Sequence, residues 1–166
     1  YTIIDNDARV TLRKQWANAT TGDDASVTLS RGATVIATLT SEAATANELD
    51  TDTTPTPVVI GETVLLNETM PGTNAGRYNK VVSCTGAADT NLVDGLTIGA
   101  GETAIVCTYT NTRIPPLLVS KTSSVISDGI NTTGPKVLPG ATLRYCILIT
   151  NADCLFIRFI VIYFFI

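Results

Sequence analysis

A lysine, a glutamate and an asparagine each fall on the apolar face of a predicted β-strand: Lys14, Glu68 and Asn111. Side chains alternate between the two faces of a strand, so Lys14 shares its face with Leu12 and Trp16. The same alternation places the glutamate with a valine and a leucine, and the asparagine with an isoleucine, a cysteine and a tyrosine. All three polar side chains are therefore predicted to point toward the protein core.

Burial predicts a specific reaction between these groups. Desolvation favours the uncharged form, so a buried lysine tends toward the nucleophilic amine and a buried glutamate toward the protonated acid. Neutral Lys14 could attack the side-chain carbonyl carbon of Asn111 while Glu68 carries protons, which would release ammonia and leave an amide cross-link. The alternatives are a buried Lys14–Glu68 ion pair with Asn111 as a hydrogen-bonding neighbour, or a strand register different from the predicted one.

The elements that must position these residues predict an all-β fold. Short alternating runs rich in Val, Thr and Ile are separated by turn residues, such as Pro71-Gly72 and Gly99-Ala100-Gly101, and no segment has a helical period. Together the runs favour a β-sandwich. The strands predicted for it are 9–16, 26–30, 34–39, 62–68, 77–84 and 102–111.

Composition excludes several classes of function. The chain has no histidine, which removes Ser-His-Asp and Cys-His catalysis and the commonest metal ligand. A net charge of -4 without a basic region argues against nucleic acid as a partner. Four cysteines without a CxxC pair indicate an oxidising compartment rather than a metal site, and no cofactor is expected.

The order of the segments predicts a piece of a tandem array. Residues 109–113 (YTNTR) are followed by 117–122 (LLVSKT), much as residues 1–7 (YTIIDND) are followed by 10–15 (VTLRKQ). This repetition indicates the end of one repeat followed by a complete domain and then a partial one. The boundaries predicted are 1–7, 8–113 and 114–153, with strands at 117–122, 136–138 and 141–151 in the partial module.

The apolar tail, residues 154–166 (CLFIRFIVIYFFI), differs in composition from everything before it. Its thirteen residues are too few to span a bilayer. Three interpretations stay open: a foreign or truncated end, a buried or donated β-strand, and the start of a membrane anchor. A membrane is a partner only in the last case.

An acidic, proline-bearing segment at 47–57 (NELDTDTTPTP) is predicted to be a solvated loop. The alternative is a calcium site that uses Glu48, Asp50 and Asp52, because carboxylate oxygens suit that ion.

Three separated pieces of the chain resemble the prealbumin-like B domains of bacterial surface adhesins and pilins. They are the K-x-W strand with Lys14, the segment GETVLLNETMPGTNAGRY with Glu68, and the closing YTNTR with Asn111, and the match covers 8–113. In that family the matching lysine, glutamate and asparagine form an intramolecular isopeptide bond. Residues 136–153 (KVLPGATLRYCILITNAD) are similar to the opening half of an immunoglobulin-like repeat of large bacterial surface proteins.

Two cysteines depart from the family pattern, since its Gram-positive members usually lack them. Cys84 ends one predicted strand and Cys107 lies in the closing strand on the face of Asn111. A disulfide between them would tie neighbouring strands and contribute about 3 kcal/mol in the loop-entropy description. The alternatives are two free buried thiols, or a disulfide that has replaced the isopeptide bond.

These resemblances imply a stalk or spacer repeat of a secreted bacterial surface adhesin, located outside the cell and acting on no external substrate. Any chemistry would be a single intramolecular cross-linking. The expected partners are neighbouring repeats or identical subunits, with a host or matrix ligand bound through other domains. The alternative function is a fibre or pilus subunit that polymerises by strand exchange through its incomplete C-terminal module. A carbohydrate-binding module has little support, because it needs exposed aromatics and the single Trp is predicted to point inward.

Overall fold

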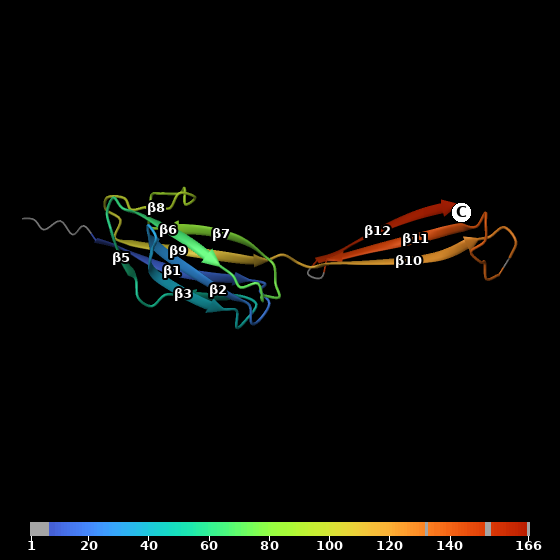
Figure 1. Cartoon of the computed structure of the whole chain (residues 1–166), viewed down its shortest axis with the longest axis horizontal. Helices are drawn as coiled ribbons and strands as arrows, with labels where there is room; N and C mark the ends of the chain where they lie inside the picture. Colours follow the sequence, from blue (N-terminus) through green and yellow to red (C-terminus); the bar gives the residue numbers. More distant parts are fainter. Residues whose placement is uncertain (1–6, 132, 152–153, 166) are drawn as a thin grey trace, which may run out of the picture. The chain divides into compact units, whose positions relative to one another are not determined.

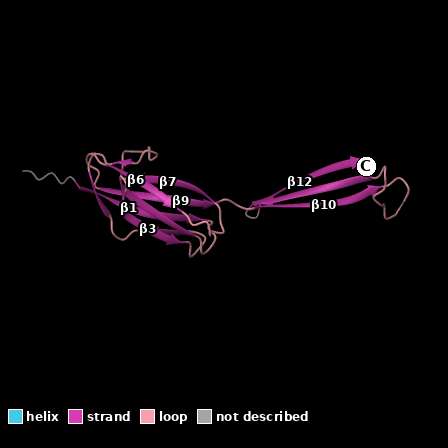
Figure 2. Cartoon of the chain, viewed as in Figure 1, coloured by secondary structure: helices cyan, strands magenta, loops and turns pink. Residues whose placement is uncertain are grey.

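The computed structural model describes the backbone of residues 7–131, 133–151 and 154–165, and the side chains of residues 8–131 and 133–151. This part of the chain contains twelve strands and no helix, which confirms the all-β prediction (Figures 1 and 2). Accordingly, no helix that could cross a membrane is found among these residues. The chain divides into two compact units, Tyr1–Ile114 and Pro115–Ile166.

The first unit contains two sheets that share one core, as in a β-sandwich. The strand order is β4-β1-β9-β7 in one sheet, where β5 also pairs with β1, and β3-β2-β6-β8 in the other. The first sheet consists of β1 (Asp7–Ala17), β4 (Glu48–Thr51), β5 (Thr56–Val59), β7 (Tyr78–Thr85) and β9 (Ala104–Arg113). The second consists of β2 (Asp24–Arg31), β3 (Thr34–Glu42), β6 (Thr63–Thr69) and β8 (Leu96–Thr97).

The pairing of β1 with β9 joins the first and last strands of this unit. It is parallel, whereas the other strand pairings in the described part of the unit are antiparallel. In this register Lys14 pairs with Tyr109 and Trp16 pairs with Asn111. A parallel pair needs a long crossover connection, and here the connection is the rest of the unit.

Alternating aliphatic side chains from both sheets build the core. Each fully buried Val, Leu or Ile contributes about 1.5–3 kcal/mol relative to an exposed one. A smaller cluster surrounds Trp16, whose ring meets that of Tyr78 edge-on at a centroid distance of 5.3 Å. The fully buried aliphatic residues of the main core include Val10, Leu12, Val27, Leu29, Val64, Leu96 and Ile105.

The prediction of a solvated loop at 47–57 is wrong, because this segment contributes the strand β4 and the start of the strand β5. Both β4 and β5 pair with β1 in antiparallel register. Neither β4 nor β5 has a strong hydrophobic pattern of its own. Both strands form because they can pair with the edge of β1. Pro57 is compatible with β5 because a proline is tolerated where its missing N–H does not interrupt a ladder.

A buried aspartate holds the loop between β6 and β7. Asp23 accepts hydrogen bonds from the N–H groups of Ala75 (2.7 Å) and Gly76 (2.8 Å) and from the Tyr78 hydroxyl (2.6 Å). Burial alone would raise the pKa of Asp23, but these hydrogen bonds lower it below its ordinary value. A Cβ at Gly76 would lie 2.6 Å from an Asp23 oxygen, so this close approach requires glycine.

The second unit is a single antiparallel sheet in the described residues. Its order is β10 (Leu117–Ser127), β11 (Thr142–Asn151) and β12 (Cys154–Phe165). The apolar tail thus forms a strand along β11, although its side chains lie outside the described residues. The strand predicted at 136–138 is wrong, since this segment belongs to the loop between β10 and β11.

That loop is organised by Asp128. Its carboxylate accepts hydrogen bonds from the backbone N–H groups of Lys136 (2.8 Å), Asn131 (2.7 Å) and Ile130 (2.9 Å), and from the Asn131 side chain. The pKa of Asp128 lies well below its ordinary value, chiefly because of the bond from Lys136. Because this carboxylate accepts hydrogen bonds from the backbone N–H groups that a strand would use for pairing, the segment forms a closed loop instead of a strand.

Candidate cross-linking site

Lys14 and Glu68 form a buried ion pair that crosses the core of the first unit. Lys14 projects from β1 and Glu68 from β6 of the opposite sheet, and both side chains are 0% exposed. The lysine Nζ lies 3.2 Å from the Glu68 Oε1 and 4.1 Å from the centroid of the Trp16 ring. The sequence therefore predicts correctly that both charged side chains point inward, on the faces that strand alternation gives them.

Desolvation lowers the pKa of Lys14 from 10.5 to about 8, against the opposing effect of the Glu68 charge. The nearby Lys80 ammonium lowers this pKa as well. With a pKa of about 8, roughly a tenth of Lys14 is neutral amine near neutral pH, against well under a thousandth for an ordinary lysine. The interior thus increases the share of the neutral amine, which is the nucleophilic form of a lysine.

Asn111 lies on the same face of the sheet as Lys14, on the neighbouring strand. Lys14 pairs with Tyr109, and Asn111 follows two residues later in β9, so the two side chains share the inward face. Asn111 is 0% exposed. Its Nδ2 donates a hydrogen bond to the Met70 Sδ at 3.1 Å, whereas its Oδ1 is buried without a hydrogen-bond partner.

The Glu68 carboxylate also lacks hydrogen bonds. Two ammonium groups lie at ion-pair distance, Lys14 at 3.2 Å and Lys80 at 3.8 Å, but both Glu68 oxygens lack a partner with hydrogen-bond geometry. Burial raises the pKa of Tyr109 to about 12, and the Glu68 charge adds to this rise, so the phenol stays protonated. Buried polar atoms without hydrogen bonds are uncommon and costly, and a catalytic role is one of the explanations for them.

The site therefore contains an amine of lowered pKa, a carboxylate and an amide carbonyl without a hydrogen bond, all buried in the core. The structure brings Lys14 and Glu68 into direct contact. It places Asn111 beside them through the β1–β9 pairing, although no hydrogen bond joins it to either residue in the described part of the chain. This set can support amide formation between Lys14 and Asn111, or persist as an ion pair beside an amide.

The predicted disulfide between Cys84 and Cys107 is present, and the alternative of two free thiols is wrong. The two residues are register partners on β7 and β9, and Cys107 is fully buried. Cys107 and Asn111 both project inward from β9 at separate positions, so the disulfide does not take the place of Asn111. By the loop-entropy description this bridge contributes about 3 kcal/mol.

The three residues considered as calcium ligands have separate hydrogen-bond partners. Glu48 accepts from backbone N–H groups of the preceding turn, Asp50 from the Ser41 hydroxyl, and Asp52 from the Thr54 N–H. Within the ranges that the structure describes, no group of three acidic, His or Cys side chains could hold a metal ion. The geometry gives the calcium alternative no support.

Two neighbours of the site are absent from the sequence-based prediction. Met70 follows Glu68 by two residues, so the alternation that places Glu68 inward could have found it. Lys80 pairs with Asn111 across β7 and β9, and its side chain is 46% exposed. No local pattern signals this lysine, because its position depends on which strand pairs with β9.

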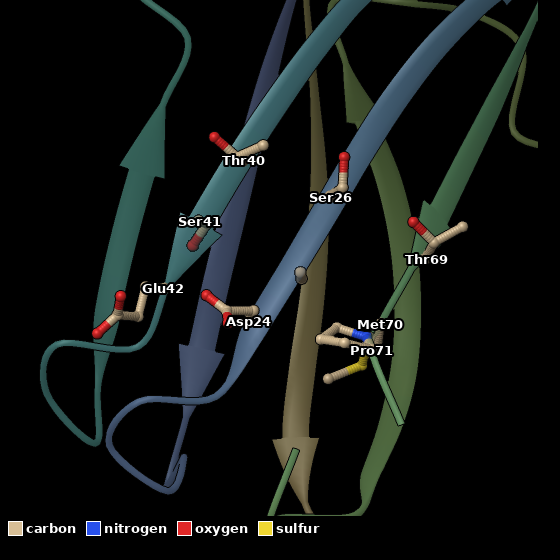
Figure 3. Close-up of a pocket in the computed structure, with 9 residues that line it drawn as sticks. Asp24, Ser26, Thr40, Ser41, Glu42, Thr69, Met70 and Pro71 are labelled. Carbon is tan, nitrogen blue, oxygen red and sulfur yellow. The ribbon is translucent and has the colours of Figure 1, made fainter. Parts of the chain in front are cut away.

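A hollow of about 580 Å³ opens next to the site between the ends of β2, β3 and β6 (Figure 3). Its wall includes Met70, the same residue that contacts the Asn111 nitrogen, and Ser41, which accepts a hydrogen bond from the Trp16 indole at 2.7 Å. The residues that line the hollow are Asp24, Ala25, Ser26, Thr40, Ser41, Glu42, Thr69, Met70 and Pro71.

No protein-family model, curated protein or solved structure matches this chain. The family resemblance therefore stays a prediction that depends on the residues themselves.

Proposed function

We propose that the first unit is a stalk or spacer repeat of a secreted bacterial surface adhesin, and that an isopeptide bond between Lys14 and Asn111 stabilises it. The observation that carries the proposal is the buried Lys14–Glu68 pair, 3.2 Å apart, next to an amide whose oxygen has no hydrogen-bond partner. The resemblance of 8–113 to prealbumin-like B domains points the same way.

The proposed reaction needs no co-reactant. The neutral Lys14 Nζ attacks Cγ of Asn111, and a bond forms between these atoms while the bond from Cγ to Nδ2 breaks. The amine loses one proton, Glu68 carries it to the departing nitrogen, and ammonia leaves. One amide and one amine become one amide and one ammonia, so atoms and charge balance.

The position of the bond suits a load-bearing spacer. The chain enters the unit through β1 and leaves it through β9, and these strands lie side by side in parallel. A bond from Lys14 to Asn111 would carry tension directly between the two strands, because the segment from Gln15 to Thr110 would lie outside the covalent path of the force. The disulfide between β7 and β9 adds a second covalent tie and is compatible with an extracellular protein.

The intact mass of the full chain, unfolded and reduced, tests the proposal beside a Lys14→Ala control. We expect the parent to be lighter than its sequence by one ammonia and the control to have its full mass. Fragmentation should then find the Lys14 and Asn111 peptides joined. A parent of full mass would reject the cross-link and leave the disulfide as the covalent tie of the unit.

A fibre or pilus subunit is the second candidate, and an exposed apolar strand favours it. Leu117, Leu118 and Val119 of β10 are 67%, 62% and 65% exposed. A single sheet with uncovered apolar side chains commonly associates with another chain. Size-exclusion chromatography and negative-stain imaging of the full chain test strand exchange, and a stable monomer would reject it.

A further inference from the structure

Met70 lies between the proposed reaction centre and the hollow described above. It follows Glu68 by two residues, just beyond the end of β6, and is partly buried. Its Sδ is 3.1 Å from the Asn111 Nδ2, and its side chain also lines the hollow of about 580 Å³. In Figure 3 the Met70 sulfur lies beside Pro71 at the end of the strand that carries Thr69.

The thioether distinguishes the two ends of the amide. A methionine sulfur accepts a weak hydrogen bond but cannot donate one, and an asparagine side chain has a donor nitrogen at one end and an acceptor oxygen at the other. Met70 therefore favours the orientation in which the nitrogen faces the sulfur. With the amide turned over, two acceptors would face each other.

We propose that Met70 is a positioning residue that orients the Asn111 amide for cross-linking, with the leaving nitrogen toward the hollow and the carbonyl oxygen toward the core. This inference rests on the proposed cross-link. The oxygen accepts no hydrogen bond, so it is available to accept one from Glu68 once that carboxylate has taken the proton of the attacking amine and negative charge develops on the oxygen. The nitrogen departs on the side of Met70, and the leaving group is ammonia, as balanced above.

The hollow offers a route for that leaving group. Asp24 and Glu42 are register partners on β2 and β3, and both residues line the hollow. Ammonia that reaches water becomes ammonium, which negative charge stabilises. The proposed orientation therefore sends the nitrogen away from the apolar core and toward the side where it can be solvated.

The test compares Met70→Leu in two backgrounds, the natural Asn111 and Asn111→Asp. Leucine keeps the volume but removes the acceptor, and a carboxyl group, whose two ends are alike, needs no such orientation. Cell-free synthesis under oxidising conditions, with samples quenched in acidic denaturant, gives the rate at which ammonia or water is lost from the full chain. Formation of the Cys84–Cys107 disulfide in the same samples reports folding, and Thr40→Ser is the matched control in the wall of the hollow.

We expect Met70→Leu to slow ammonia loss about fivefold to tenfold, the effect of one hydrogen bond, and to leave water loss in the Asn111→Asp background unchanged. Equal slowing in both backgrounds would show that Met70 acts by packing and would overturn the inference, as would an unchanged rate in both. A parent that never loses ammonia would instead overturn the proposed cross-link itself.

A second measurement does not depend on turnover. In Lys14→Ala, which has no nucleophile, the side-chain NH₂ signals of Asn111 should shift in nitrogen-15 NMR spectra when Met70→Leu is added. Signals that stay in place would overturn the proposed contact.

Discussion

Lys14 and Lys121 stand at matching places in two strands of similar sequence, 10–15 and 117–122. Each ammonium lies over an aromatic ring, at 4.1 Å from the Trp16 centroid and 4.4 Å from the Tyr145 centroid. Lys14 is nevertheless fully buried, whereas Lys121 is exposed. The first unit has a second sheet that covers the lysine and supplies Glu68, and the described strands of the second unit form one sheet.

The difference shows that the opposing sheet, and not the strand itself, buries Lys14 and lowers its pKa. The local motif is shared by both units. The change in pKa, the ion-pair partner and the unsatisfied amide of the first unit all come from strands that are distant in the sequence.

The largest effect is expected from Glu68→Ala. This change leaves Lys14 buried without its ion-pair partner and removes the proton carrier, so the cross-link should not form. Loss of one member of a buried pair costs about 3–5 kcal/mol, and we expect the free energy of unfolding of the first unit to fall by at least that amount. Thermal and urea unfolding measure it. Unchanged stability would contradict a buried site at this position, and Glu68→Gln serves as the control that keeps the shape.

The next largest effect is expected from opening the disulfide. Replacing Cys84 and Cys107 together with serine should lower the stability of the first unit by about 3 kcal/mol. Calorimetry with and without a reducing agent measures the change. The second unit provides the comparison, because Cys146 is a free cysteine and Cys146→Ser should leave the response to reduction unchanged. A first unit that tolerates reduction without loss would contradict this prediction.

The pH should control cross-linking through Lys14. Its pKa of about 8 predicts that the rate of ammonia loss falls about tenfold for each pH unit below that value, as the neutral amine becomes scarcer. Mass spectra of newly made protein at a series of pH values measure this rate. A rate that does not change with pH would exclude Lys14 as the nucleophile.

The same pKa predicts how stability depends on pH in Asn111→Ala, which cannot cross-link. Lys14 has a pKa of about 8 when folded and an ordinary value of 10.5 when unfolded. Between these values the unfolded chain binds more protons, so the contribution of Lys14 to stability should rise as pH increases through this window. Adding Lys14→Met should remove this component of the unfolding profile, and a profile that is unaffected would contradict the lowered pKa.

The smallest effect is expected from Lys121→Ala. An exposed cation over an aromatic ring contributes about 0.5–1 kcal/mol, and the lysine has no opposing sheet in the described residues. Unfolding of the full chain should show a loss no larger than that. A loss of stability as large as that of Glu68→Ala would mean that Lys121 is covered in the second unit as Lys14 is in the first. The contrast between the two lysines would then be wrong.

Much of the candidate site could be predicted because strand alternation is a local property. The period of two places Lys14, Glu68 and Asn111 on inward faces without knowledge of which strands are neighbours. Cys84 and Cys107 could be proposed as a pair because they are the two cysteines of the predicted domain, 8–113. The strands β4 and β5 could not be found in this way, because their pairing with β1 outweighs a weak pattern rich in acidic residues and proline.

The amino-acid sequence by itself determined the all-β class, the inward direction of the three polar residues and the positions of the cysteines, since each follows from composition or from a period of two residues. Only the tertiary structure decided that β1 pairs in parallel with β9, that Glu68 reaches Lys14 from the opposite sheet, and that Met70 contacts the Asn111 nitrogen. The physical reason is that strand pairing and sheet packing join residues far apart in the chain, and the energy of those contacts depends on the whole core.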